Sequence, residues 1–121
     1  MTVWTWIAVA LVGGAGAVAR FAVDKFVGGR IDSELPLGTF AINISGSFLL
    51  GLFDGLALSG NAMILAGTAT IGAYTTFSTW MLETHRLAED GEFAAGLANI
   101  VVSFGVGFGA VALGHLIGAR A

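Results

Sequence analysis

The sequence predicts an all-α membrane protein of four transmembrane helices. Of its 121 residues, 56% are hydrophobic and 11% are charged, whereas a soluble domain carries about 25% charged residues. The mean hydropathy is +0.88. A bilayer crossing takes about 20 mostly apolar residues, and four apolar runs meet that length: residues 4–22, 37–58, 62–81 and 93–117. The polar connections between them are short, so we expect a single domain over residues 1–121 and exclude a water-soluble monomer.

Composition excludes several other classes of protein. The chain has no cysteine, so it can form neither disulfides nor thiolate metal sites. Its formal charge is −3 and its Lys and Arg residues are scattered, which gives no indication of nucleic-acid binding. Its 19 glycines are typical of helices that pack closely in lipid.

The first apolar run, residues 4–22, is expected to be a retained span. No positively charged segment precedes it, as one would in a signal peptide. Arg20 lies near its end, before a predicted polar loop from Asp24 to Glu34. The guanidinium either reaches the lipid headgroups or places a permanent positive charge at a pore mouth, where it would concentrate anions.

The second run, residues 37–58, carries a polar stripe. At about 100° per residue, Asn43, Ser47 and Asp54 fall on one side of a helix. Such groups can form hydrogen bonds between helices, or the Asn43 amide can donate to a permeating anion. A tight turn is predicted at residues 59–61, before the third run.

The third run, residues 62–81, ends in a segment rich in hydroxyls. Four lie within five positions, at Thr75, Thr76, Ser78 and Thr79. Hydroxyls compete for backbone hydrogen bonds, which favours an interruption of this helix over an unbroken one. Backbone outside a helix at membrane depth lines a cavity or is buried in protein, so the pattern indicates an ion site. A charged loop is predicted over residues 83–92.

Aromatic rings interleave with these hydroxyls and extend the candidate site. Phe77 and Trp80 could meet an anion with their electropositive edges, although such a spacing also serves simple packing. In the fourth run, residues 93–117, Asn99 and Ser103 lie one turn apart on one face.

Glycines four residues apart place small residues on one helical face, at positions 51 and 55, 105 and 109, and 114 and 118. We expect these faces to pack on other helices. Four helices alone enclose little water, because each must also face lipid, so oligomerisation is expected. Four of the five Lys and Arg residues, all but Arg120, lie on the side of the membrane reached after the first and third runs, which favours an external N-terminus.

Three motifs together resemble those of the Fluc, or CrcB, family of fluoride channels. They are the glycine-rich stretch ending at Arg20, the pattern from Gly38 through Asn43 to Ser47, and residues 75–79. The resemblance covers nearly the whole chain in motif order and spacing. It implies an antiparallel dimer with two narrow fluoride pores and a structural Na⁺ at the centre of the interface.

The resemblance also implies a role for each matching residue. Arg20 would be the vestibule arginine, Asn43 the asparagine beside the pore, and Phe77 the first of two pore phenylalanines. The backbone carbonyls of Gly72 and Thr75 would bind Na⁺. Ser78, Thr79 and Ser103 would belong to the polar lining.

Two positions depart from the family pattern. Trp80 replaces the second phenylalanine, and Asn99 replaces a tyrosine that is common in the fourth span. Tryptophan keeps an electropositive edge but is bulkier, and asparagine keeps a donor without the ring. Each change therefore alters one predicted fluoride-binding position, or station, along the pore.

These observations predict passive fluoride export from the cytoplasm and no enzyme activity, since no nucleophile, base and orienting group form a constellation. The alternatives are a small multidrug exporter, which would need a carboxylate deep in the membrane, and a membrane assembly subunit that transports nothing. The partner is either a second copy or a paralogue. The slight charge bias and the two departures favour a paralogue.

Overall fold

The computed structural model describes residues 2–33 and 35–121, and all regular structure among them is helical. Three helices in this part of the chain are long and apolar enough to cross a bilayer, namely α1, α2 and α6. The protein is therefore a multi-pass membrane protein. The elements are α1 (Val3–Arg30), α2 (Leu37–Gly55), α3 (Gly60–Met63), the π-helix η1 (Ile64–Ile71), α4 (Gly72–Tyr74), α5 (Ser78–Glu89) and α6 (Phe93–Ala119).

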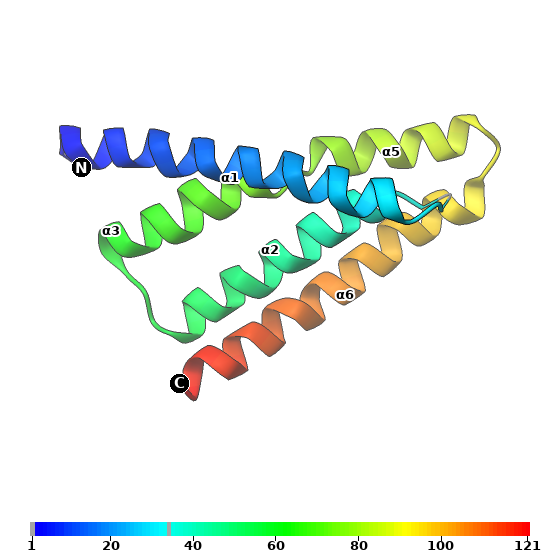
Figure 1. Cartoon of the computed structure of the whole chain (residues 1–121). Helices are drawn as coiled ribbons and strands as arrows, with labels where there is room; N and C mark the ends of the chain where they lie inside the picture. The colour runs from blue at the N-terminus through cyan, green and yellow to red at the C-terminus, as the bar shows by residue number, and fades with distance from the viewer. Residues whose placement is uncertain (1, 34) are drawn as a thin grey trace.

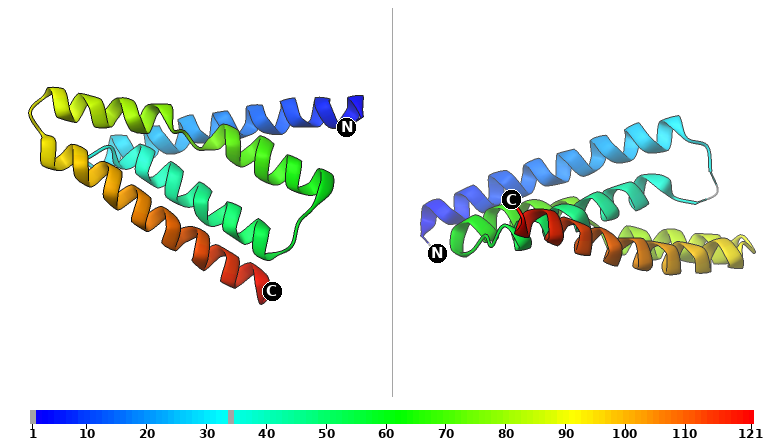
Figure 2. Two further views of the ribbon diagram at one scale, coloured as in Figure 1. Left: turned by 180° about the vertical axis from the view of Figure 1, so that it is seen from behind. Right: turned by 90° about the horizontal axis from the view of Figure 1, so that it is seen from below.

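The elements form a helical bundle in which the direction of the chain alternates (Figure 1). α1 and the run from α3 to α5 progress one way, whereas α2 and α6 run the opposite way. Both termini lie at one end of the bundle, as the two further views confirm (Figure 2). The pair α2 and α6 makes the most extensive contact, while α1 packs mainly on η1, α2 and α4.

Glycine determines how closely α2 and α6 approach. A Cβ at Gly51 would collide with the carbonyl oxygen of Val111, and one at Gly114 would collide with that of Phe48. Gly55 and Gly118 meet the opposite backbone in the same way. The predicted packing of these two glycine pairs is thus confirmed, because only glycine allows two helix backbones to come this near.

The third glycine pair behaves differently. A Cβ at Gly105 or Gly109 would meet no atom of the described chain within 4 Å. Both residues are on α6 but turned away from α2. This face therefore packs on no helix within the described chain, and its packing on a second subunit stays a prediction.

The predicted loop from Asp24 to Glu34 is largely helical. α1 continues to Arg30, and Ile31 is the first residue to leave the helical conformation, with φ −121° and ψ 117°; Glu34 lies outside the described residues. Nothing before Ile31 forces a break, since the one proline of the chain comes later. A helix of 28 residues is about 42 Å long and exceeds a hydrocarbon core of about 30 Å, so its polar end can project from the membrane.

The other two predicted connections are also shifted. α2 ends at Gly55, so the chain turns at residues 56–59, where Ala57 has a φ of 59°. The predicted charged loop over residues 83–92 is helical as far as Glu89, and the chain turns at Gly91, whose φ is 79°. His85 pairs with Glu89 one turn later, a spacing that supports a helix. The prediction from charged composition alone therefore started this loop too early in the chain.

The third predicted span, residues 62–81, is divided among shorter elements. Its π-helical stretch has a geometry that is rare and is often found at functional sites. α4 ends at Tyr74, Thr75 is extended with φ −82° and ψ 162°, and α5 begins at Ser78. The non-helical residues 75–77 are here called the connector.

Candidate functional site

Asn43 on α2 holds the connector through a pair of hydrogen bonds. Its side-chain nitrogen donates to the carbonyl oxygen of Thr76 at 2.9 Å, and the Thr76 N–H donates to its side-chain oxygen at 2.9 Å. The amide therefore replaces helical partners that the connector has lost. Close approach is possible because position 46 is glycine, where a Cβ would collide with the Thr75 side chain.

Thr76 also starts the helix that follows. Its hydroxyl accepts a hydrogen bond from the Thr79 N–H at 3.2 Å, which satisfies one of the free N–H groups at the beginning of α5. The residue is only 8% exposed. Thr76 is thus bonded on both its backbone and its side chain, and it links the connector to α2 and to α5.

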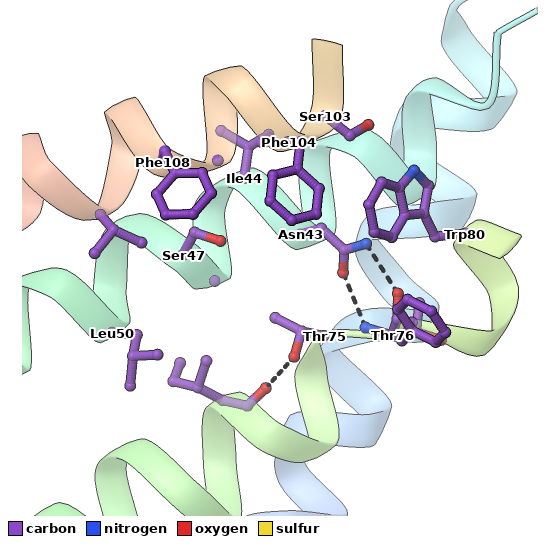
Figure 3. A pocket seen from close by; sticks show the side chains of 15 residues that line it. Asn43, Ile44, Ser47, Leu50, Thr75, Thr76, Trp80, Ser103, Phe104 and Phe108 are labelled. Carbon is purple, nitrogen blue, oxygen red and sulfur yellow. Dashed lines mark hydrogen bonds between the residues drawn. The ribbon is translucent and has the colours of Figure 1, made fainter. Parts of the chain in front are cut away.

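A pocket of about 370 Å³ opens between α2, α6 and the connector (Figure 3). We call it the aromatic pocket. Its rings are those of Phe77, Trp80, Phe104 and Phe108. Phe77 meets Trp80 edge to face, with ring centroids 5.8 Å apart and planes at 84°. Trp80 then contacts Phe104, and Phe104 contacts Phe108. Ring edges carry partial positive charge, so the pocket wall can attract an anion without a formal charge.

Polar side chains enter the same pocket from α2 and α6. Asn43, Ser47 and Ser103 all line it. Within the described chain, no hydrogen-bond partner is found for the hydroxyl of Ser47 or of Ser103. Asn43 has two amide hydrogens and donates one to Thr76. The pocket therefore holds three donors that are available to an anion.

A second pocket, of about 390 Å³, lies between α1, α2 and the start of α5. We call it the arginine pocket, because Arg20 lines it together with Asp24, Thr39 and Thr79. Thr76 lines both pockets. The two pockets are thus neighbours that meet at the connector.

The structure brings most of the predicted site residues to these two pockets. Asn43, Thr75, Phe77, Trp80 and Ser103 line the aromatic pocket, and Arg20 and Thr79 line the arginine pocket.

Ser78 and Asn99 line neither pocket. The Ser78 hydroxyl lies 3.4 Å from that of Thr76. Asn99 is buried between α5 and α6, where it donates to the Thr84 hydroxyl at 2.9 Å. Sequence spacing placed Asn99 and Ser103 on one face of the fourth helix, yet only Ser103 reaches the pocket.

Several lining residues were missed by the sequence analysis as members of the site. Ser47 had been noted only as part of a polar stripe, whose third member, Asp54, instead bonds to His115 at 3.0 Å. Phe104 and Phe108 carry no polar signal, although their spacing of four residues on a helix places them on one face. Thr39 and Thr76 are polar lining residues that had likewise not been assigned to the site.

The carbonyl groups of Gly72 and Thr75, which the family resemblance predicts to bind Na⁺, have lost their helical partners. In an unbroken helix they would accept from the N–H groups of residues 76 and 79. Those N–H groups donate instead to Asn43 and to the Thr76 hydroxyl. Both carbonyls are thus released at the C-terminal end of a helix, where the dipole is negative.

Comparison with known proteins identifies the relatives of this chain. The family model described as "CrcB-like protein, Camphor Resistance (CrcB)" matches residues 7–115. The chain belongs to the CrcB family. CrcB relatives include "Fluoride-specific ion channel FluC 2" of Mycolicibacterium paratuberculosis, which is 57% identical over 94% of this chain and 93% of the relative.

Two further CrcB relatives extend the comparison. "Fluoride-specific ion channel FluC 2" of Mycobacterium bovis is 54% identical over 97% of this chain and 93% of its own length. "Fluoride-specific ion channel FluC 1" of Symbiobacterium thermophilum is 40% identical over 94% and 97%, respectively. The resemblance inferred from the motifs is confirmed, and it covers whole chains rather than a shared fragment.

Proposed function

We propose that this CrcB protein is a fluoride-selective channel that lets cytoplasmic fluoride leave the cell passively. The observation that carries the proposal is the aromatic pocket, where unpaired donors and ring edges share one wall. The relatives named fluoride-specific ion channels support the choice of ion.

The chemistry of the pocket suits a small, strongly hydrated anion. Entry requires that donors replace the water of hydration, and exit requires that no single site bind too tightly. The hydroxyls of Ser47 and Ser103 and the free Asn43 hydrogen are neutral donors. They provide several weak stations instead of one strong site, which is the condition for conduction. No step of this process changes a covalent bond.

The arginine pocket is proposed as the entrance to this path. Its guanidinium is permanently charged and raises the local concentration of anions. Thr39, Thr76 and Thr79 supply hydroxyls between that charge and the connector. An anion would then pass the connector at Thr76, which both pockets share.

We also propose that residues 60–89 cross the membrane once, as a third span broken at the connector. Each part is too short to span alone, since α5 has 12 residues and a crossing takes about 20. With this segment the chain crosses four times. The location of both termini at one end of the bundle agrees with an even number of membrane crossings (Figure 2).

The working channel is proposed to be an antiparallel dimer. The pocket opens toward the surface of the single chain, and large apolar side chains such as Leu97, Val101 and Phe104 on α6 are exposed there. A second subunit would cover part of this face and lipid the remainder. Relatives labelled FluC 1 and FluC 2 are compatible with a paralogue as partner, besides a second copy. Na⁺ would bind the released carbonyls of Gly72 and Thr75 at the interface and stabilise it.

Fluoride efflux from liposomes that contain the purified chain alone tests the function. We expect fast efflux, read with a fluoride electrode, and negligible chloride efflux under the same gradient. Equal rates for both anions would contradict the proposal. Absence of fluoride efflux both from the chain alone and after co-reconstitution with a paralogue would also contradict it, whereas efflux only in the second case would establish an obligate partner.

A further inference from the structure

Trp80 and Asn99, the two residues that depart from the family pattern, lie in direct contact. Trp80 is the third residue of α5, and Asn99 is in α6. The indole nitrogen of Trp80 donates to the backbone carbonyl oxygen of Asn99 at 3.0 Å. The two departures therefore belong to a single interaction between helices.

Thr84 completes a closed set of hydrogen bonds. The Asn99 amide donates to the Thr84 hydroxyl at 2.9 Å, and that hydroxyl donates to the Trp80 carbonyl oxygen at 2.9 Å. The Asn99 amide also approaches the same carbonyl oxygen at 3.5 Å. Each donor has an acceptor, and buried networks of this kind rigidify their surroundings when every member is satisfied.

The network lies behind the aromatic pocket and not inside it. Asn99 is 5% exposed, and neither Asn99 nor Thr84 lines a pocket. Only the indole ring of Trp80 reaches the pocket, with its nitrogen turned away from Asn43 (Figure 3). The strongest donor of this side chain is therefore not available to an anion, which meets only the carbon-bound hydrogens of the ring.

We propose that the Asn99 amide and Thr84 are positioning residues that hold the Trp80 backbone beside α6, so that the indole keeps its bond to the Asn99 carbonyl and one orientation, and that this locked ring sets the width and the anion selectivity of the aromatic pocket. The inference rests on the proposed fluoride channel. A ring that cannot turn keeps the constriction at a fixed size, and a fixed narrow path excludes an anion larger than fluoride. Phe77, packed edge to face on Trp80, is held in turn.

A fluorescence experiment measures directly how far the Trp80 ring can turn. The chain has three tryptophans, and replacing the exposed Trp4 and Trp6 by phenylalanine leaves Trp80 as the only one. In this background, Thr84→Val keeps the side-chain shape but removes the hydroxyl, whereas Thr84→Ser keeps the hydroxyl. Asn99→Ala removes the amide but keeps the carbonyl that accepts from the indole, and it serves as a second, independent variant.

We expect Thr84→Val and Asn99→Ala to lower the fluorescence anisotropy of Trp80 in liposomes. The ratio of fluoride to chloride efflux should fall about fivefold, the factor that corresponds to one ordinary hydrogen bond. Thr84→Ser should retain both values. A purely stabilising role would reduce the yield of folded protein but leave the selectivity ratio unchanged.

The lock is rejected if both variants keep the anisotropy and selectivity of the background protein. If the background protein moves no fluoride either alone or after co-reconstitution with a paralogue, the proposed function fails and the selectivity role fails with it. The anisotropy comparison would still decide whether Asn99 and Thr84 hold the ring.

Discussion

The α2–α6 pair and the connector region use opposite means to hold the chain together. α2 and α6 meet mainly through glycines whose backbones lie against each other, beside a single side-chain hydrogen bond in the described chain, between Asp54 and His115. The connector is held by hydrogen bonds from Asn43 and Thr76. Apolar packing is suited to a fixed scaffold, whereas polar attachment allows non-helical backbone to lie beside a pocket.

This division has a reason in the membrane. Lipid tails solvate apolar side chains as well as another helix does, so helices associate through close packing and hydrogen bonds. Packing uses up no donor, and it leaves the hydroxyls of α2 and α6 free to face the pocket. The scaffold and the site can thus occupy the same two helices, at opposite ends of their contact.

The largest effect is expected at the scaffold. Gly114→Ala places a methyl group on the Phe48 carbonyl and should separate α2 from α6, with a loss of about 1–3 kcal/mol, as for other overpacked sites. Thermal unfolding in detergent measures this loss. Gly105→Ala on the same helix meets open space and is the matched control, and equal stability of the two variants would contradict the account.

The next effect is expected where the connector is attached. Asn43→Leu removes both hydrogen bonds to Thr76, each of which contributes about 1 kcal/mol, and leaves a backbone N–H without a partner. Fluoride efflux should fall by more than about tenfold while the α2–α6 scaffold still folds. Ser45→Ala, which loses contacts at an exposed position of the same helix, should retain most of the flux. Wild-type flux from Asn43→Leu would show that the connector needs no such attachment.

A smaller effect is expected from the free donors. Ser47→Ala combined with Ser103→Ala removes two hydroxyls that bond to nothing in the described chain, so stability should be unchanged. Fluoride efflux should fall about tenfold, since two weak neutral hydrogen bonds to the ion are lost, at about 0.7 kcal/mol each. Ser59→Ala, at an exposed turn outside both pockets, is the control. Loss of stability in the double variant would assign these hydroxyls to the scaffold.

The smallest effect is expected at the entrance. Arg20→Gln removes one charge from the arginine pocket and should lower fluoride efflux severalfold at low ionic strength, where a charge concentrates anions most effectively. The difference should shrink as salt is added, because the Debye length falls to about 8 Å at physiological ionic strength. Arg120→Gln, near the C-terminus, controls for net charge. An effect of Arg20→Gln that is independent of salt would indicate direct contact instead of attraction at a distance.

Much of the fold could be predicted because the bilayer constrains it strongly. The apolar runs at residues 4–22, 37–58 and 93–117 correspond to α1, α2 and α6. Helix ends were less predictable, as at Arg30 and Glu89. A polar residue beyond an apolar run can belong either to a loop or to a helix that continues out of the membrane. Hydropathy detects the edge of the apolar layer and not the end of the helix.

The candidate site was predicted unevenly for a similar reason. Asn43 and Ser103 could be found because polar groups at membrane depth are rare and costly. Phe104 and Phe108 could not be found, because the local sequence around an aromatic residue in an apolar helix does not show whether its ring faces lipid, a partner or a pocket. Asn99 had the correct residue type for a lining donor, but its neighbours Thr84 and Trp80 take up its amide.

By itself, the sequence determined the membrane location, the main helices, the family motifs and the donors that an anion would need. Each of these depends on composition or on short spacings, which hydropathy and helical geometry translate directly. Only the tertiary structure decided which donors remain free. A hydrogen-bonding group is available to an ion when no neighbour already uses it, and the neighbours of Asn43, Ser103 and Asn99 come from helices far apart in the chain.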